Sequence, residues 1–167
     1  IAGEVPRGAG ARPVAREKIS LDIGSVRLTE RHVRSDPPSE DDLARVRDDV
    51  RAALARVPFR PAGEVVGVAG TVTTIAAFAK NIVPYDGARV HGADLSLDEL
   101  AASTAELARL PLDERKRLAA IDPKRADVIV AGAVLTAEVL RFCGARRMTV
   151  SDRGVRWGLV ARAFAGD

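Results

Sequence analysis

The sequence has few cysteines, few histidines and no long apolar run, and each shortage excludes a class of protein. One cysteine in 167 residues cannot form an internal disulfide, which favours a reducing, cytoplasmic location. No apolar run approaches the roughly 20 residues that span a bilayer, so we expect no membrane partner. The two histidines, His32 and His91, lie far apart without cysteines or carboxylates at zinc-type spacing, so we expect no metal ligated by these side chains.

The composition is otherwise that of a globular domain with a good core. Hydrophobic residues make up 47% of the chain and charged residues 29%, and 167 residues suffice for one domain or at most two small ones. The net charge of +3 is modest, and basic and acidic residues are mixed along the chain. The sequence therefore has no cluster of basic residues that could bind a nucleic-acid backbone, and we expect no nucleic-acid partner.

The most informative stretch runs from residue 65 to residue 78. Residues 65–69 form an apolar run rich in β-branched side chains, typical of a fully buried parallel strand, and a helical pattern follows over 71–81. Gly70 and Thr71 form the turn, so there is almost no linker between the strand and the helix. The free N–H groups at the start of the helix would then face a ligand beyond the strand, usually phosphate. The pattern is neither a Walker A loop nor GxGxxG, so a purely structural turn is an equally good interpretation.

Apolar periodicity predicts the other elements. Strands are predicted at 18–26 and 147–150, a loop at 83–93, and a loop or disordered arm with an edge-strand remnant over 1–17. Further helices are predicted at residues 26–31, 39–57, 96–108, 111–119, 122–142 and 155–164. Capping boxes open those at 39–57 and 96–108. Strands that alternate with helices predict an α/β fold in three layers, with a mostly parallel sheet covered by helices.

A second turn from strand to helix occurs at residues 151–154, Ser-Asp-Arg-Gly. Because the carboxyl ends of parallel strands meet at one edge of a sheet, where ligands bind, we expect this turn beside Gly70. Asp152 could cap the last helix, bind a cation or hold a ribose. Arg153 and Arg156 could neutralise phosphate oxygens or be solvated surface residues.

Several motifs in order resemble one known family. Residues 67–76 resemble the Gly-Thr-x-Thr-Thr turn of the exopolyphosphatase and guanosine pentaphosphate phosphohydrolase (Ppx/GppA) phosphatases. Residues 89–92 (Arg-Val-His-Gly), 125–133 and 151–159 are similar to later segments of that family, and residues 20–30 are similar to an earlier one. The resemblance covers about residues 18–165 and rests on these separated motifs, which occur in the same order as in the family.

The resemblance implies a fold and a place within a larger enzyme. The family has an actin-like ATPase (ribonuclease H-like) catalytic unit with two lobes around a cleft, and residues 18–167 resemble its second lobe only. The first lobe, with a phosphate loop and the catalytic glutamate, has no match here, so no catalytic residue is expected in this chain. The parent enzyme would be a cytoplasmic, bacterial hydrolase, and we expect a homodimer.

The resemblance also implies an activity. The full enzyme would use Mg²⁺ to remove terminal phosphate from polyphosphate or guanosine pentaphosphate, and the isolated chain is expected to be inactive. Trp157 stands where the family usually has Glu, which favours the alternative of a non-hydrolysing nucleotide- or polyphosphate-binding module; a regulatory or assembly partner is the third possibility. The residues expected to bind substrate or phosphate are Gly70, Thr71, Thr73, Asp152, Arg153, Arg156 and, less directly, Arg27.

Overall fold

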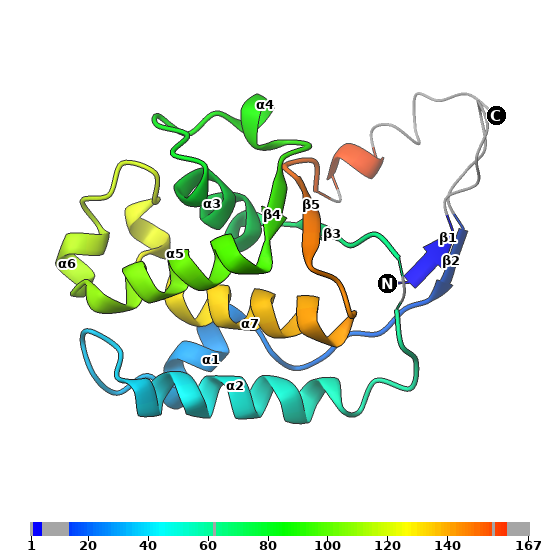
Figure 1. Cartoon of the computed structure of the whole chain (residues 1–167), viewed down its shortest axis with the longest axis horizontal. Coiled ribbons are helices and arrows are strands. Elements are labelled where there is room, and N and C mark those ends of the chain that lie inside the picture. Colours follow the sequence, from blue (N-terminus) through cyan, green and yellow to red (C-terminus); the bar gives the residue numbers. More distant parts are fainter. Residues whose placement is uncertain (1, 5–13, 62, 155, 160–167) are drawn as a thin grey trace.

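The computed structural model describes residues 2–4, 14–61, 63–154 and 156–159 (Figure 1). In chain order the elements are β1 (Ala2–Glu4), β2 (Val14–Glu17), α1 (Ser25–His32), α2 (Glu40–Leu54), β3 (Val66–Val68), α3 (Gly70–Ala79), α4 (Gly87–Val90), β4 (Asp94–Ser96), α5 (Leu97–Arg109), α6 (Leu112–Arg115), the 3-10 helix η1 (Pro123–Arg125), α7 (Ile129–Phe142) and β5 (Arg147–Ser151). Among these residues, no helix has the length and apolar character needed to cross a membrane.

Helix α7 is the centre of the molecule, as its apolar sequence predicts. Figure 1 shows it between α5 above and the pair α1 and α2 below, and it contacts all three as well as α3. Its residues Ile129, Val130 and Leu140 are almost fully buried. At Gly132 a Cβ atom would stand 2.5 Å from Thr71 Cγ2 and 3.2 Å from Ser25 Cβ, so the missing side chain lets α3 and α1 approach α7 closely.

The main sheet has three strands in the order β3-β5-β4. β3 pairs with β5 in parallel and β4 pairs with β5 antiparallel, so the expected mostly parallel sheet is mixed instead. The buried side chains Leu95, Met148 and Val150 face the helices. The layers therefore run from the sheet to α3 and α5, then α7, then α1 and α2, and the helices lie on one side of the sheet (Figure 1).

The expectation of a fully buried strand at residues 65–69 is wrong. β3 is an edge strand whose Val66 and Val68 are 59% and 50% exposed. Gly67, between these two valines, faces the core: a Cβ atom on it would stand 2.6 Å from Met148 Sδ. The β-branched run reflects strand propensity, which does not require burial on both faces.

The predicted strand at residues 18–26 is also wrong. Residues 18–24 have no strand structure, and α1 begins at Ser25. Leu21 and Ile23 pack against the core while Ile19 is exposed, so the alternation describes an extended connection with one face on the core. Such a segment mimics a strand in sequence, because alternation reports burial and not pairing.

The N-terminal helix caps agree with the sequence more closely. In both predicted capping boxes the Ser side chain accepts a backbone N–H, Ser39 from Asp42 and Ser96 from Glu99, while the carboxylate returns to the backbone of the Ser. The predicted helix at 122–142 is instead divided into η1 and α7, with Asp122 accepting the N–H of Lys124 at 3.0 Å. This division places Arg125 at the end of η1, directly before the turn that leads to α7.

Short elements account for the other differences. The expected loop at 83–93 contains the four-residue helix α4, and the three-residue strand β4 follows it. β2 pairs with β1 where the sequence predicts a loop or disordered arm, and residues 5–13 of that arm lie outside the described residues. Of the helix predicted at 155–164, residues 156–159 are helical and the others lie outside the described residues.

Candidate functional site

Two turns from strand to helix lie side by side at one edge of the sheet, as the sequence predicts. Val68 at the end of β3 is in register with Ser151 at the end of the parallel strand β5. Asp152 follows Ser151 directly, and Gly70 follows Val68 after one intervening residue, Ala69. The carboxyl ends of parallel strands are where open α/β folds bind ligands.

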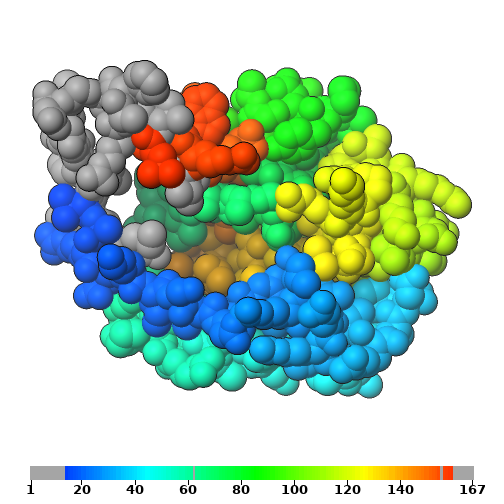
Figure 2. All heavy atoms as spheres, turned by 180° about the vertical axis from the view of Figure 1, so that it is seen from behind, coloured from blue at the N-terminus to red at the C-terminus, as the bar shows by residue number. Residues whose placement is uncertain are grey.

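A cleft of about 1,140 Å³ opens at this edge. Figure 2 shows the face that carries it, where the red segment near 156–159, the green segment around α4 and the yellow segment between α6 and α7 adjoin one another. The lining residues are Ala69, Gly70, Thr73, Thr74, Tyr85, Ala119, Ala120, Ile121, Asp122, Pro123, Arg125, Asp152, Gly154, Arg156 and Trp157. The cleft therefore joins residues from four separate parts of the chain.

The backbone is strained where α3 enters the cleft. Ala69, the N-cap residue of α3, has φ 78° and ψ 166°, a region that is essentially reserved for glycine and costs of the order of 1–3 kcal/mol for other residues. Its carbonyl accepts the N–H of Thr73 at 3.2 Å, which starts the helix. Strain of this kind is common where the backbone must approach a ligand.

The N-terminus of α3 carries uncompensated positive charge. Among the described residues, no side chain caps this end of the helix, and its first turn contains no acidic residue. The free N–H groups and the helix dipole together amount to roughly half a positive charge. Such an end attracts an anion, and a phosphate is the ligand that most often occupies it.

Arg125 adds a full positive charge at the same place. Its guanidinium group lies against Gly70, so closely that a Cβ atom there would overlap it. Its Nε atom is 4.0 Å from Asp122 Oδ2, and the side chain is 45% exposed. A guanidinium held against a positive helix end is electrostatically unfavourable on its own, and an anion between the two would reverse the sign of that interaction.

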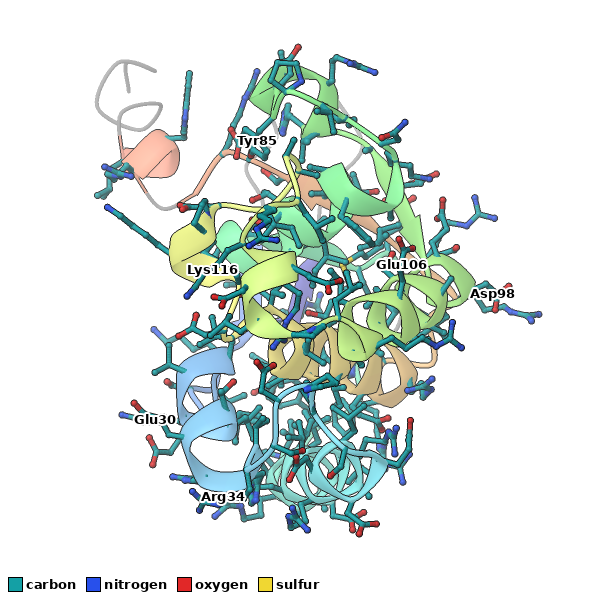
Figure 3. The ribbon with its side chains drawn as sticks, turned by 90° about the vertical axis from the view of Figure 1, so that its left-hand side faces the viewer. Glu30, Arg34, Tyr85, Asp98, Glu106 and Lys116 are labelled. Atoms are coloured by element: carbon teal, nitrogen blue, oxygen red, sulfur yellow. The ribbon has the colours of Figure 1, made fainter. Side chains whose placement is uncertain are left out.

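Asp152 is held in place within the same cleft. Its Oδ1 atom accepts the hydroxyl of Tyr85 at 2.7 Å, and a Cβ on Gly87 would stand 2.5 Å from its Oδ2. Burial, and then the hydrogen bond to Asp152, raise the pKa of Tyr85, so the phenol stays protonated and donates this bond at neutral pH. Figure 3 shows Tyr85 beside the end of β5.

Four of the seven expected site residues line the cleft: Gly70, Thr73, Asp152 and Arg156. Thr71 instead packs its methyl group toward Gly132 of α7. Arg153 stacks over the ring of Trp157 at 5.3 Å and is not among the lining residues. Arg27 lies exposed on α1, paired with Asp22, and does not line the cleft either.

The cleft offers few ligands for a metal ion. No group of three or more His, Cys, Asp or Glu side chains that could hold a metal exists among the described residues. Asp122 and Asp152 are the carboxylates that line the cleft in that part of the chain. Mg²⁺ commonly binds through one or two carboxylates together with substrate phosphates, so these residues fit a metal carried in with a phosphate chain.

Comparisons with known proteins identify the family. Residues 9–165 match the Ppx/GppA phosphatase family. The chain belongs to this family. Exopolyphosphatase 2 of Mycobacterium tuberculosis (strain CDC 1551 / Oshkosh) is 37% identical over 155 residues, which cover 88% of this chain and 48% of that protein. The chain thus spans about half the length of this relative.

Solved structures of Ppx/GppA proteins have the same fold as this chain. The Aquifex aeolicus family member superposes with a TM-score of 0.85 at 34% identity, over 95% of this chain and 51% of that one. An exopolyphosphatase from Cytophaga hutchinsonii superposes with a TM-score of 0.74 at 26% identity, over 91% of this chain and 51% of that one. The fold is therefore the α/β, actin-like fold of the Ppx/GppA family.

Sequence reasoning missed several of the residues that line the Ppx/GppA cleft. Arg125 was not among the expected site residues, because the sequence predicts one continuous helix over residues 122–142. Tyr85 lies in the predicted loop, and its role depends on a contact with Asp152, 67 residues away. The substitution of Trp157 for the usual Glu was visible in the sequence, but its position in the cleft was not.

Proposed function

We propose that this chain forms one wall of the active-site cleft of a phosphoanhydride hydrolase. The full protein would remove terminal phosphate from inorganic polyphosphate or from guanosine pentaphosphate. Family membership and the names of the relatives, exopolyphosphatases, support this proposal over the non-hydrolysing binding module. Residues 18–167 would serve as the second lobe, with the catalytic carboxylate supplied by the rest of the protein.

The observation that carries the proposal is the convergence of positive groups in one cleft. The uncapped helix end, Arg125 and Arg156 line the same cleft. Charge-assisted hydrogen bonds from guanidinium groups and backbone N–H groups are the usual means of holding phosphate. In hydrolysis these donors would bind and orient the phosphate chain and stabilise the negative charge that develops on it.

We further propose that Mg²⁺ accompanies the substrate. The ion would neutralise phosphate oxygens, and Asp152 or Asp122 would be the residues of this chain that approach it. The single free cysteine, Cys143, supports a reducing, cytoplasmic location. A homodimer is proposed as well, because Val66 and Val68 expose apolar surface on an edge strand.

The proposal is tested by titrating the protein with inorganic tripolyphosphate in a calorimeter. Arg125→Gln should weaken binding by about tenfold, because it removes one charge-assisted contact. Lys124→Gln is the matched control, since Lys124 carries the same charge one residue earlier and is not among the residues that line the cleft. Equal loss in both variants, or no binding by the unmodified protein, would count against the proposal.

A further inference from the structure

We propose that the cleft is built for a nucleoside polyphosphate and not for a bare phosphate chain, with Trp157 and Tyr85 as the residues that recognise the base. The inference rests on the proposed function, because it takes the phosphate end of the cleft as given. It concerns the groups that a phosphate chain alone would leave unused. These are the aromatic rings of Tyr85 and Trp157, together with the carboxylate of Asp152 where Asp122 is the residue that approaches Mg²⁺.

Aromatic side chains are scarce in this chain and concentrated in the cleft. Only 4% of the residues are aromatic, yet the one tyrosine and the one tryptophan both line it. Tyr85 is 43% exposed and Trp157 56% exposed, so each ring offers free surface. Inorganic polyphosphate has no apolar face to cover these rings, whereas a purine or pyrimidine stacks on such surfaces.

Arg153 prepares one of these rings for stacking. Its guanidinium carbon lies 5.3 Å from the ring centroid of Trp157. A cation on one face of an indole restrains the ring and leaves the rest of its surface for another planar group. Arg153 therefore acts through Trp157, which explains why an arginine expected to bind phosphate is absent from the lining of the cleft.

Asp152 argues against a bare phosphate chain. A carboxylate repels phosphate, but it accepts hydrogen bonds from the hydroxyl groups of a ribose. The group is held in place on two sides, because Tyr85 donates to Oδ1 at 2.7 Å and Gly87 leaves room for Oδ2. A fixed carboxylate beside two rings, facing a cationic helix end, matches the sugar, base and phosphates of one nucleotide.

The test compares three triphosphates by calorimetry with the purified protein. GTP carries base, ribose and phosphates, ribose 5-triphosphate lacks the base, and inorganic tripolyphosphate lacks both. We expect GTP to bind at least about tenfold more tightly than tripolyphosphate, with ribose 5-triphosphate between them. As the only tryptophan, Trp157 should also change its fluorescence with GTP more than with tripolyphosphate.

Variants assign the preference to residues. Trp157→Leu should reduce the ratio of GTP to tripolyphosphate affinity by about tenfold, and Trp157→Phe should retain most of it because a ring remains. In the absence of Mg²⁺, Asp152→Asn should strengthen tripolyphosphate binding, since it removes a charge that repels phosphate. Phe59→Leu, an aromatic residue that does not line the cleft, is the control and should leave the ratio unchanged.

The outcomes separate this inference from the proposed function. If tripolyphosphate binds as tightly as GTP, or if Trp157→Leu leaves the ratio unchanged, the base-recognition inference is wrong while the phosphate site stands. If neither ligand binds, both are wrong. If only GTP binds and Arg125→Gln does not affect it, the cleft binds the nucleoside and the proposed phosphate site is wrong.

Discussion

The guanidinium of Arg125 occupies the space that a side chain on Gly70 would fill. This contact joins two segments 55 positions apart in the sequence, the first turn of α3 and the 3-10 helix η1. It places a full positive charge at a helix end that is already positive. Two positive groups in contact repel each other, and in the proposed site a bound anion would offset that repulsion.

Gly70→Ala should separate stability from anion binding. The new methyl group displaces the end of a flexible side chain, and alanine is favourable in a helix, so the free energy of unfolding should change by less than about 1 kcal/mol. Tripolyphosphate affinity should fall by about tenfold, because Arg125 is moved away from the helix end. Gly24→Ala, at a site where a Cβ meets nothing within 4 Å, is the control for both measurements. Unchanged affinity in Gly70→Ala would show that the contact is incidental.

Stability should decrease in acid partly through Glu99. The hydrogen bond from Lys80, at 2.5 Å, and the backbone N–H of Ser96 lower the pKa of Glu99 from 4.5 to about 2. A lowered pKa in the folded state contributes stability above pH 4.5 that is lost as the pH falls toward 2. Urea unfolding at pH 5 and at pH 3 should show a smaller loss in Glu99→Gln than in the unmodified protein. The exposed Glu30→Gln (Figure 3) should behave like the unmodified protein, and identical losses in all three would refute this assignment.

The exposed edge of β3 should mediate self-association. Val66 and Val68 present apolar side chains on a strand with an unpaired edge in the main sheet. We expect sedimentation at about 100 µM to show dimers, and Val68→Lys to shift them toward monomers, because an edge lysine blocks pairing. Val26→Lys, on the exposed surface of α1, should leave the dimers intact. A clean monomer of the unmodified protein would contradict the proposal.

The 167-residue chain by itself should not hydrolyse polyphosphate or guanosine pentaphosphate. Hydrolysis needs an in-line water, a base that orients it and a metal clamp on the transferring oxygens. The chain spans 48% of the length of exopolyphosphatase 2 and would form one wall of the proposed cleft. Phosphate release should stay at background in the presence of Mg²⁺. Steady release that survives further purification and is lost in Arg125→Gln would overturn the expectation.

The sequence predicted the features that depend on local rules. The two capping boxes at Ser39 and Ser96 were correct, because capping needs residues only three positions apart. The buried helix α7 was correct from its apolar content, although its start was placed too early. The shared sheet edge of Gly70 and Asp152 followed from two turns and the rule for parallel strands.

The features that could not be predicted from the sequence depend on contacts between distant segments. β4 is an antiparallel strand of three residues, which is too short to show an alternating apolar pattern in the sequence. The segment at 18–24 alternates like a strand yet pairs with none, since its side chains need only one face on the core. Arg125 reaches the cleft because the chain turns between η1 and α7, and the break falls within a run that reads as one helix.

The most direct test of the phosphate site is an amide NMR titration of the protein with inorganic tripolyphosphate. The account predicts saturable shifts concentrated at the backbone N–H groups of Gly70 and its successors in α3, with smaller shifts near Arg125, Asp152 and Arg156. Arg125→Gln should reduce the shifts at Gly70 itself. Shifts spread over the exposed arginines of α1 and α2, with none at Gly70, would contradict the account.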